Sequence, residues 1–370
     1  MSADSAPSMF AHVGALTSLP LSQTVVDLDV DRRGDEGLLD RLVRDAATRV
    51  VLVDGACVAV PKQHASCGTG ELSCTEDPAA PRPDAQAPTG ELELALLSAP
   101  DIGELAGANG LLMVYLGIDR TEMPAVSYLG IDVTPRTTIP RDDVPAAGHE
   151  PACDDRLQSL RERFDWIELR SFAPCASARD VGLATSAVAV CTWQRSQRFC
   201  PACGAPVRPI LSGWAQTCTN PHDEKRLLFP RIEPAVITAI VDDEDRILLQ
   251  HNRAWRPRFH SVSAGFVEAG ESLEHAVRRE AMEEVGIEIG EVRYLGSQAW
   301  PFPASIMLGF RAHALSAEVR VDHEEVGEAR WFTREELEHE VGTGAVEPPG
   351  RASIARHMIE QWLGHELQGR

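Results

Sequence analysis

The stretch GFVEAGESLEHAVRREAMEEVGI, from Gly265 to Ile287, constrains the fold more than any other part of the chain. Its apolar residues recur at helical spacing after Ser272, a residue type that often caps a helix N-terminus. Gly286 supplies a common C-terminal stop. The pattern predicts a helix over residues 272–285, entered from a glycine-containing loop.

This helix carries Glu280, Glu283 and Glu284 within five positions. Glu280 and Glu284 are one turn apart, a rise of roughly 6 Å. Like charges at this spacing each cost roughly 0.2–0.5 kcal/mol on an exposed helix, whereas a divalent cation reverses the sign. Carboxylate oxygens suit Mg²⁺ or Mn²⁺. From the spacing alone, a solvated acidic face balanced by Arg278 and Arg279 is an equal alternative.

The residues around the glutamates resemble the signature of the Nudix hydrolase family, G-x5-E-x7-R-E-U-x-E-E-x-G-U, in which U is aliphatic. The matching positions are Gly265, Glu271, Arg279, Glu280, Ala281, Glu283, Glu284, Gly286 and Ile287, with Ala281 smaller than the usual aliphatic residue. The resemblance implies an α/β (α+β) fold, the Nudix α/β/α sandwich. It also implies metal-dependent hydrolysis of a nucleoside diphosphate linked to another moiety.

The same resemblance assigns roles to single residues. Glu280 and Glu284 would bind Mg²⁺ or Mn²⁺, helped by Glu283, the carbonyl of Ala264 and a distal glutamate. That distal residue is read as Glu325, although a one-residue slip would make it Glu324. Arg279 would pair with Glu271 and fix the loop against the helix. We expect Glu284 to be the catalytic base, with Glu325 as the second choice.

Downstream, SQAWPFPASIM (297–307) resembles an element of the NADH pyrophosphatase subfamily. Trp300 and Phe302, stiffened by prolines, would form a platform that stacks on a base or nicotinamide, at ~1–3 kcal/mol per base. Gln298 and Ser305 would supply hydrogen bonds. The alternative is a proline-rich loop whose aromatic side chains fill the core. By resemblance, three further residues contact the substrate: Phe229 and Phe266 in the base pocket, and Ala355 through its backbone.

A cysteine module precedes this region. FCPACGAPVRPILSGWAQTC gives the spacing C-x2-C-x14-C, with Cys200, Cys203 and Cys218. The resembling subfamily closes a zinc ribbon with a fourth cysteine, which this chain lacks. His222 is the predicted fourth ligand of a structural Zn²⁺ site, and Asp223, a water or a metal-free ribbon remain alternatives.

The chain has 370 residues, which favours two domains with a small module between them. We expect an N-terminal Nudix-like domain over 1–195, with a disordered loop near 61–92. The zinc-ribbon-like module would span 196–232 and the catalytic Nudix domain 233–370. No catalytic constellation stands out in the N-terminal half, where two YLGID words (115–119 and 128–132) are too short to establish a repeat.

The net charge of −21 argues against a broad nucleic-acid or anionic-membrane surface. The leading hypothesis is hydrolysis of NAD(H) to NMN(H) and AMP by a cytoplasmic homodimer without a membrane partner. Removal of the NAD cap from RNA 5′ ends is an alternative, with Arg253, Arg256 and Arg258 as a local basic patch. A non-catalytic NAD(H) sensor and a broader nucleoside-diphosphate-sugar hydrolase are further alternatives.

Overall fold

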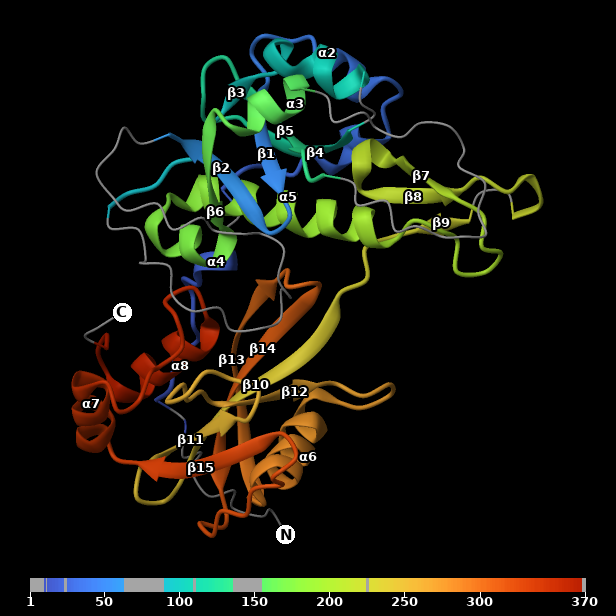
Figure 1. Cartoon of the computed structure of the whole chain (residues 1–370). Helices are drawn as coiled ribbons and strands as arrows, with labels where there is room; N and C mark the ends of the chain where they lie inside the picture. Colours follow the sequence, from blue (N-terminus) through green and yellow to red (C-terminus); the bar gives the residue numbers. More distant parts are fainter. Residues whose placement is uncertain are drawn as a thin grey trace.

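The structure is a computed structural model, and it describes residues 10, 12–22, 25–62, 90–108, 111–135, 155–223 and 226–367. An N-terminal domain and a C-terminal domain lie one above the other, and a small three-stranded module projects beside the first (Figure 1). The predicted disordered loop at 61–92 lies outside the described residues apart from its ends. None of the described helices has the length and apolar character needed to span a membrane.

The N-terminal domain is a six-stranded sheet between helices. Its strands are β1 (Arg49–Asp54), β2 (Cys57–Pro61), β3 (Leu97–Ser98), β4 (Leu112–Asp119), β5 (Val126–Asp132) and β6 (Phe164–Glu168). Its helices are α1 (Leu38–Leu42), α2 (Pro100–Ala108), α3 (Asp155–Arg161), α4 (Leu169–Phe172) and α5 (Ala178–Ser196), with 3-10 turns η1 (Pro20–Ser22), η2 (Val30–Gly34) and η3 (Ala173–Cys175). Strands β1 and β2 form a hairpin, because Gly55 adopts a positive φ and turns the chain between them.

The cysteine module consists of β7 (Val207–Ile210), η4 (Leu211–Gly213), β8 (Ala215–Cys218), η5 (Pro221–Asp223) and β9 (Leu227–Leu228). It packs on the N-terminal domain. The indole of Trp214 donates to the Tyr115 carbonyl at 2.6 Å, and the guanidinium of Arg33 stacks over the same indole.

The C-terminal domain contains a second six-stranded sheet. Its elements are β10 (Glu233–Val241), β11 (Ile247–Asn252), β12 (Ser263–Phe266), α6 (Leu273–Val285), β13 (Ile289–Trp300), β14 (Ser305–Ala314), β15 (Val326–Phe332), α7 (Arg334–Thr343) and α8 (Ile354–Leu363). One apolar layer packs under α6 and another under α8, which gives the expected α/β/α sandwich. An acidic turn joins β10 to its antiparallel partner β11.

The two domains share one topology. The N-terminal order β4-β5-β1-β2-β6, with β3 on β1, repeats as β13-β14-β10-β11-β15, with β12 on β10. In each sheet the central pair is parallel, β1 with β5 and β10 with β14. A Tyr-Leu-Gly sequence sits at a bulge in each edge strand, ending at Gly117 in β4 and at Gly296 in β13. The N-terminal domain is therefore Nudix-like in topology, as expected.

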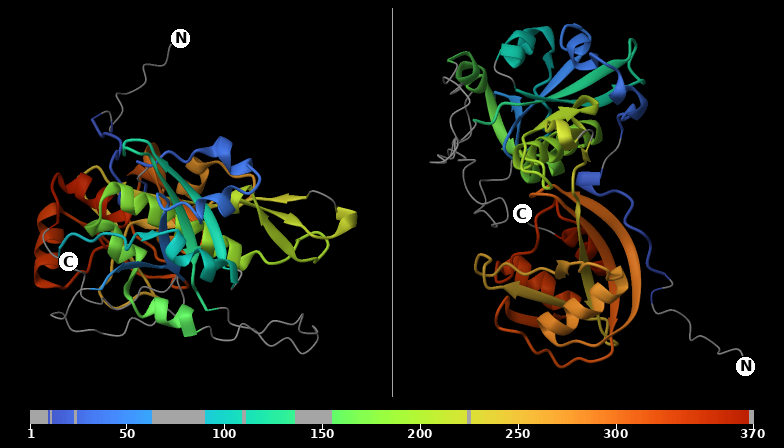
Figure 2. Two further views of the ribbon diagram at one scale, coloured as in Figure 1. Left: turned by 90° about the horizontal axis from the view of Figure 1, so that it is seen from above. Right: turned by 90° about the vertical axis from the view of Figure 1, so that its right-hand side faces the viewer.

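The N-terminal segment, defined as residues 12–22 together with Phe10, departs from the expected domain boundary. Phe10, Val13 and Leu19 are buried in the C-terminal core, whereas Leu21 is buried in the N-terminal core. The Leu16 N–H donates to the Leu295 carbonyl at 2.7 Å. The segment thus runs along the edge strand β13 (Figure 2), and the first part of the chain completes the C-terminal domain.

Candidate functional site

The candidate site lies where helix α6 faces strand β12. Ser272 caps the helix by accepting the His275 N–H at 3.2 Å, and Gly286 ends it with a φ of 68°. Glu280 and Glu284 are about 6 Å apart along the helix, close to the ~6.8 Å between alternate residues of a strand. Glu284 accordingly meets Ser263 and Glu280 meets Gly265, the two positions on either side of Ala264.

Glu284 is buried, with 6% of its surface exposed. Its Oε2 accepts the Ser263 hydroxyl at 2.6 Å and the Gln250 amide at 3.0 Å. Burial raises the pKa of this carboxyl to about 7, although both hydrogen bonds oppose the rise. Neither Gln250 nor Ser263 is among the predicted site residues. The available signal for Gln250 is a polar residue directly after the apolar start of β11.

The Glu280 carboxylate packs against the backbone of Gly265, which has no side chain. A Cβ placed on Gly265 would lie 2.0 Å from Glu280 Cδ, so only glycine leaves room for this carboxylate. Burial also raises the pKa of Glu280, and the Arg279 guanidinium, which donates to its Oε1 at 2.8 Å, opposes that rise. The signature glycine is therefore explained by side-chain packing rather than by backbone conformation.

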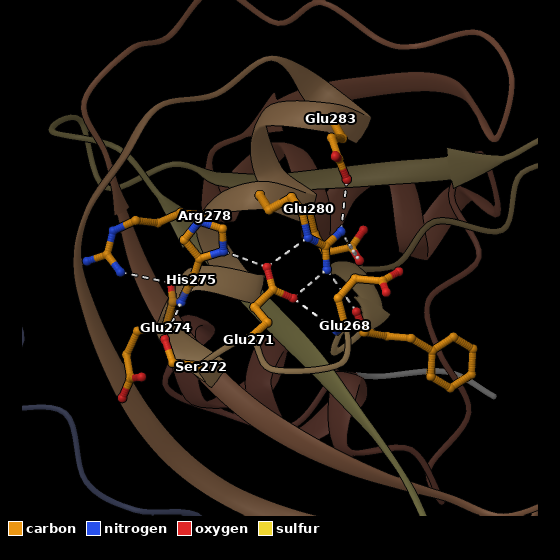
Figure 3. Close-up of polar contacts among 10 residues, drawn as sticks. Glu268, Glu271, Ser272, Glu274, His275, Arg278, Glu280 and Glu283 are labelled. Carbon is orange, nitrogen blue, oxygen red and sulfur yellow. Dashed lines mark hydrogen bonds and ion pairs between the residues drawn. The ribbon is translucent and has the colours of Figure 1, made fainter.

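Arg279 connects the loop to the helix. Its guanidinium binds both oxygens of Glu271 at 2.9 Å, which confirms the predicted pair. It also donates to Glu283 at 2.9 Å and to the Phe266 carbonyl at 2.9 Å. The three glutamates that bind this guanidinium, Glu271, Glu280 and Glu283, are labelled in Figure 3. Arg279 holds the pKa of Glu271 well below its usual range, so Glu271 is a permanent anion that positions the loop.

The distal glutamate directly precedes β15 and lies beside the end of β11. The Glu325 carbonyl accepts the Arg253 N–H at 2.8 Å, and the Glu325 side chain is exposed. Burial is the main cause of the raised pKa values of Glu280 and Glu284, and the charge of Glu325 raises both further. Glu324 is not among the main causes of either rise, and Glu325 stays the predicted distal glutamate.

These oxygen donors fit a divalent cation. The Oε2 atom of Glu284 accepts hydrogen bonds from Ser263 and Gln250. No described residue donates a hydrogen bond to its Oε1. A cation would also offset the cost of ionising two buried carboxyls. Glu283 is more peripheral, because 60% of its side chain is exposed and it turns toward Arg279.

A cleft of ≈ 480 Å³ lies at the end of β12 and the start of β10. It is lined by Arg231, Ile232, Glu233, Pro234, Phe266, Val267 and Glu268. Phe266 is 57% exposed, and Phe229, two residues before Arg231, is 56% exposed. Of the predicted substrate residues, Phe266 is the one that lines this cleft.

The predicted aromatic platform requires correction. Phe302 is only 5% exposed and is packed in the core of the N-terminal domain, with the Arg170 guanidinium 4.6 Å from its ring centre. Trp300 is half-buried and meets Phe302 edge-on at 5.1 Å. The loop therefore docks the two domains, because its apolar rings gain more from a core than from solvent. The structure thus agrees with the alternative expectation, a proline-rich loop whose aromatic side chains fill the core.

Gln298 also differs from expectation. It is fully buried, its Nε2 donates to the Ala352 carbonyl at 2.9 Å, and its Oε1 accepts the Ile354 N–H at 2.8 Å. It fixes the start of α8, so we leave it out of the substrate contacts. Ser305 is buried at the start of β14, and Ala355 is buried in the layer under α8. Nothing in their surroundings identifies a ligand.

The cysteine module brings together Cys200, Cys203, Cys218 and Asp223, whose ligand atoms lie within 4.8 Å of one another. Within the described part of the chain, no other group of acids, cysteines and histidines gathers this closely. Three sulfurs and one oxygen fit a tetrahedral zinc site. His222, the predicted ligand, is exposed and outside the group. Its neighbour Asp223 takes the position because the short turn η5 directs that side chain to the cysteines.

Comparison with known protein families matches residues 231–353 to the NUDIX domain and residues 195–225 to the NADH pyrophosphatase zinc ribbon domain. NAD-capped RNA hydrolase NudC of Mycobacterium tuberculosis is 42% identical over 74% of this chain and 87% of its own length. NAD-capped RNA hydrolase NUDT12 of Macaca fascicularis is 30% identical over 74% of this chain and 62% of its own length. Among solved structures, a NUDIX hydrolase from Nitrosomonas europaea aligns with 46% of this chain and 94% of its own, at 22% identity and a TM-score of 0.36.

Proposed function

Because the chain belongs to the Nudix hydrolases, and within them to the NADH pyrophosphatase subfamily, we propose that it hydrolyses the pyrophosphate bond of NAD(H) to NMN(H) and AMP. The observation that carries this proposal is the seating of Glu280 and Glu284 on β12, which positions two carboxylates one helical turn apart. The names of the relatives support the dinucleotide as substrate.

In this proposal Glu280, Glu284, Glu283 and Glu325, with the Ala264 carbonyl, hold Mg²⁺ or Mn²⁺. The bound cation would neutralise the pyrophosphate and lower the pKa of an attacking water. Ser263 and Gln250 orient Glu284, which we propose as the base. Arg279 and Glu271 keep the loop in place without contacting the substrate.

We assign the cleft beside Phe266 to the base or nicotinamide. Its volume of ≈ 480 Å³ falls within the usual range for small-molecule sites. Phe266 offers an exposed ring for stacking, Phe229 a second ring nearby, and Arg231 a positive charge for a phosphate. Trp300 remains a proposed contact through its exposed part, with Ser305 and the Ala355 backbone as weaker assignments. Asp223 completes a proposed structural Zn²⁺ site with the three cysteines.

The second candidate activity is removal of the NAD cap from RNA. It is favoured by the relatives named NAD-capped RNA hydrolases. Of the three arginines expected to form a basic patch, Arg256 is paired with Glu347, whereas Arg253 and Arg258 are exposed. Those two guanidiniums each donate to one backbone carbonyl and keep their charge. Cleavage of a capped RNA should therefore weaken with added salt more steeply than cleavage of NADH. The homodimer and the cytoplasmic location remain predictions.

The decisive experiment measures products from NADH, NAD⁺, ADP-ribose and NAD-capped RNA with Mg²⁺ or Mn²⁺. Wild type is compared with Glu284→Gln and with Glu274→Gln, an exposed glutamate on the same helix. Release of AMP and NMN(H) by wild type and Glu274→Gln, but not by Glu284→Gln, is expected. Absence of turnover on all four substrates, with tight NADH binding retained, would support the sensor alternative instead.

A further inference from the structure

A second cavity, of ≈ 300 Å³, lies between β14, α8 and the N-terminal segment. It is lined by His12, Val13, Gly14, Asp245, Arg311, Arg334, Gln361, Trp362, Leu363 and Gly364. Along β14, Phe310 and Ala312 belong to the apolar layer under α6, and the side chain of Arg311 between them points to the opposite face. The cavity is therefore separated from the glutamate site by the sheet.

Arg311 is buried, and among the described residues it forms no salt bridge with an acid. Only 5% of its surface is exposed, and its Nε has no hydrogen-bond partner. Within the described part of the chain, its one hydrogen bond is long, from Nη2 to the neutral Gln361 Oε1 at 3.4 Å. Arg356, the other deeply buried arginine, shows the usual arrangement: it pairs with Glu360 at 2.6 Å and donates to the Leu367 carbonyl at 2.8 Å. A buried guanidinium without such a partner is costly.

Among the described residues that line the cavity, two arginines share one acid. Asp245 is the one acidic residue lining the cavity, and it is already paired with Arg334 at 2.6 Å. Arg293 lies directly opposite Arg311 in the β13–β14 register. Burial lowers the pKa of Arg311 to about 10, so the side chain remains charged at neutral pH. The cavity thus holds one uncompensated positive charge.

We propose that this cavity is a binding site for the oxyanion group of a small molecule, a phosphate or a carboxylate, with Arg311 as the principal ligand and Arg334 as the second. A guanidinium binds both groups through paired N–H donors. Because His12 to Gly14 line one wall, a bound oxyanion would hold the N-terminal segment against α8. Ligand binding at this site would stabilise the C-terminal domain independently of catalysis.

The test is the thermal unfolding midpoint of the full chain during titration with inorganic phosphate, and separately with acetate. Ionic strength is held constant with chloride, and no Mg²⁺ or Mn²⁺ is added. Arg311→Gln removes the proposed ligand. Gln361→Glu places a carboxylate beside Arg311 and supplies the missing anion from the chain itself. Arg278→Gln is the matched control, because Arg278 is exposed and binds only backbone carbonyls. Glu284→Gln separates the effect from the glutamate site.

We expect a saturable rise in the midpoint for wild type, Arg278→Gln and Glu284→Gln, and no such rise for Gln361→Glu or Arg311→Gln. Gln361→Glu should also unfold at a higher temperature than wild type in chloride alone, and this result stands even if Arg311→Gln does not fold. The more effective of phosphate and acetate identifies the preferred group. An equal, non-saturating rise in all variants would reflect the general effect of excluded salts and would overturn the proposal. So would loss of the response in Glu284→Gln.

Discussion

Replacing Gly265 by alanine is expected to abolish most of the activity while leaving the fold intact. The new Cβ would lie 2.0 Å from Glu280 Cδ, and ordinary contact begins at 3.4 Å, so the carboxylate must move by at least 3.4 − 2.0 = 1.4 Å. A displacement of about 1 Å can cost ~100-fold in rate, and we expect a fall in kcat of at least this order. Gly265 has no positive φ. Alanine should therefore leave the free energy of unfolding unchanged or raise it by ~0.4–1 kcal/mol.

The assay combines kcat and KM for NADH, titration of Mg²⁺ or Mn²⁺, and urea unfolding. Gly342→Ala in α7 is the matched control, because its Cβ would meet nothing within 4 Å, and it should keep full activity. In a Glu280→Gln background, Gly265→Ala should add little, since both changes remove the same interaction. The reasoning fails if Gly265→Ala keeps its kcat and metal requirement, or if its activity loss follows a matching loss of stability.

Three other predictions concern Glu284, the zinc site and Phe10. Without added Mg²⁺ or Mn²⁺, Glu284 holds a proton in the folded state up to its pKa of about 7, against 4.5 for the free group. Stability should therefore fall between about pH 5 and about pH 8, by on the order of 3 kcal/mol. Urea unfolding of Glu284→Gln should lack this slope, and an unchanged slope would contradict the buried-carboxyl assignment. Asp223→Ala should lower the zinc content measured by elemental analysis, and His222→Ala should not; the reverse result would restore His222 as the ligand. Phe10→Ala should cost roughly 3–5 kcal/mol in urea unfolding, whereas a cost below about 1 kcal/mol would show that the N-terminal segment adds little to the core.

The parts of the structure that were predicted correctly depend on local physics. The helix begins after Ser272 and ends at Gly286 because capping and helical periodicity act within a few residues. The pair between Arg279 and Glu271 follows from a fixed spacing across one loop. Such features can be derived from a short stretch of sequence without knowing what packs against it.

The parts that were mispredicted depend on distant partners or on side-chain direction. Phe302 looks like an exposed platform in sequence, but the N-terminal domain, far away in the chain, supplies the core that covers it. Phe10 joins the C-terminal core although it lies near the other end of the chain. Asp223 and His222 are adjacent, and only the geometry of one short turn decides which of them reaches the cysteines.

The two sheets also separate what the fold contributes from what the residues contribute. Both sheets have the same strand order. Each also has a bulge glycine that faces a backbone carbonyl from the first 30 residues of the chain: Asp27 at Gly117 and Leu16 at Gly296. In the N-terminal sheet, α2 occupies the place that α6 takes in the other, between the third and fourth strands.

The helix α2, PDIGELAGA, offers only Asp101 and Glu104 as acids and has no arginine. Without a second pair of glutamates one turn apart, and without an arginine to anchor the loop, the shared topology cannot assemble the carboxylate site. The sheet determines the place at which carboxylates of a helix can face the backbone of a neighbouring strand. The sequence of that helix then decides whether the place becomes a metal site, so only the C-terminal copy is expected to carry the hydrolytic chemistry.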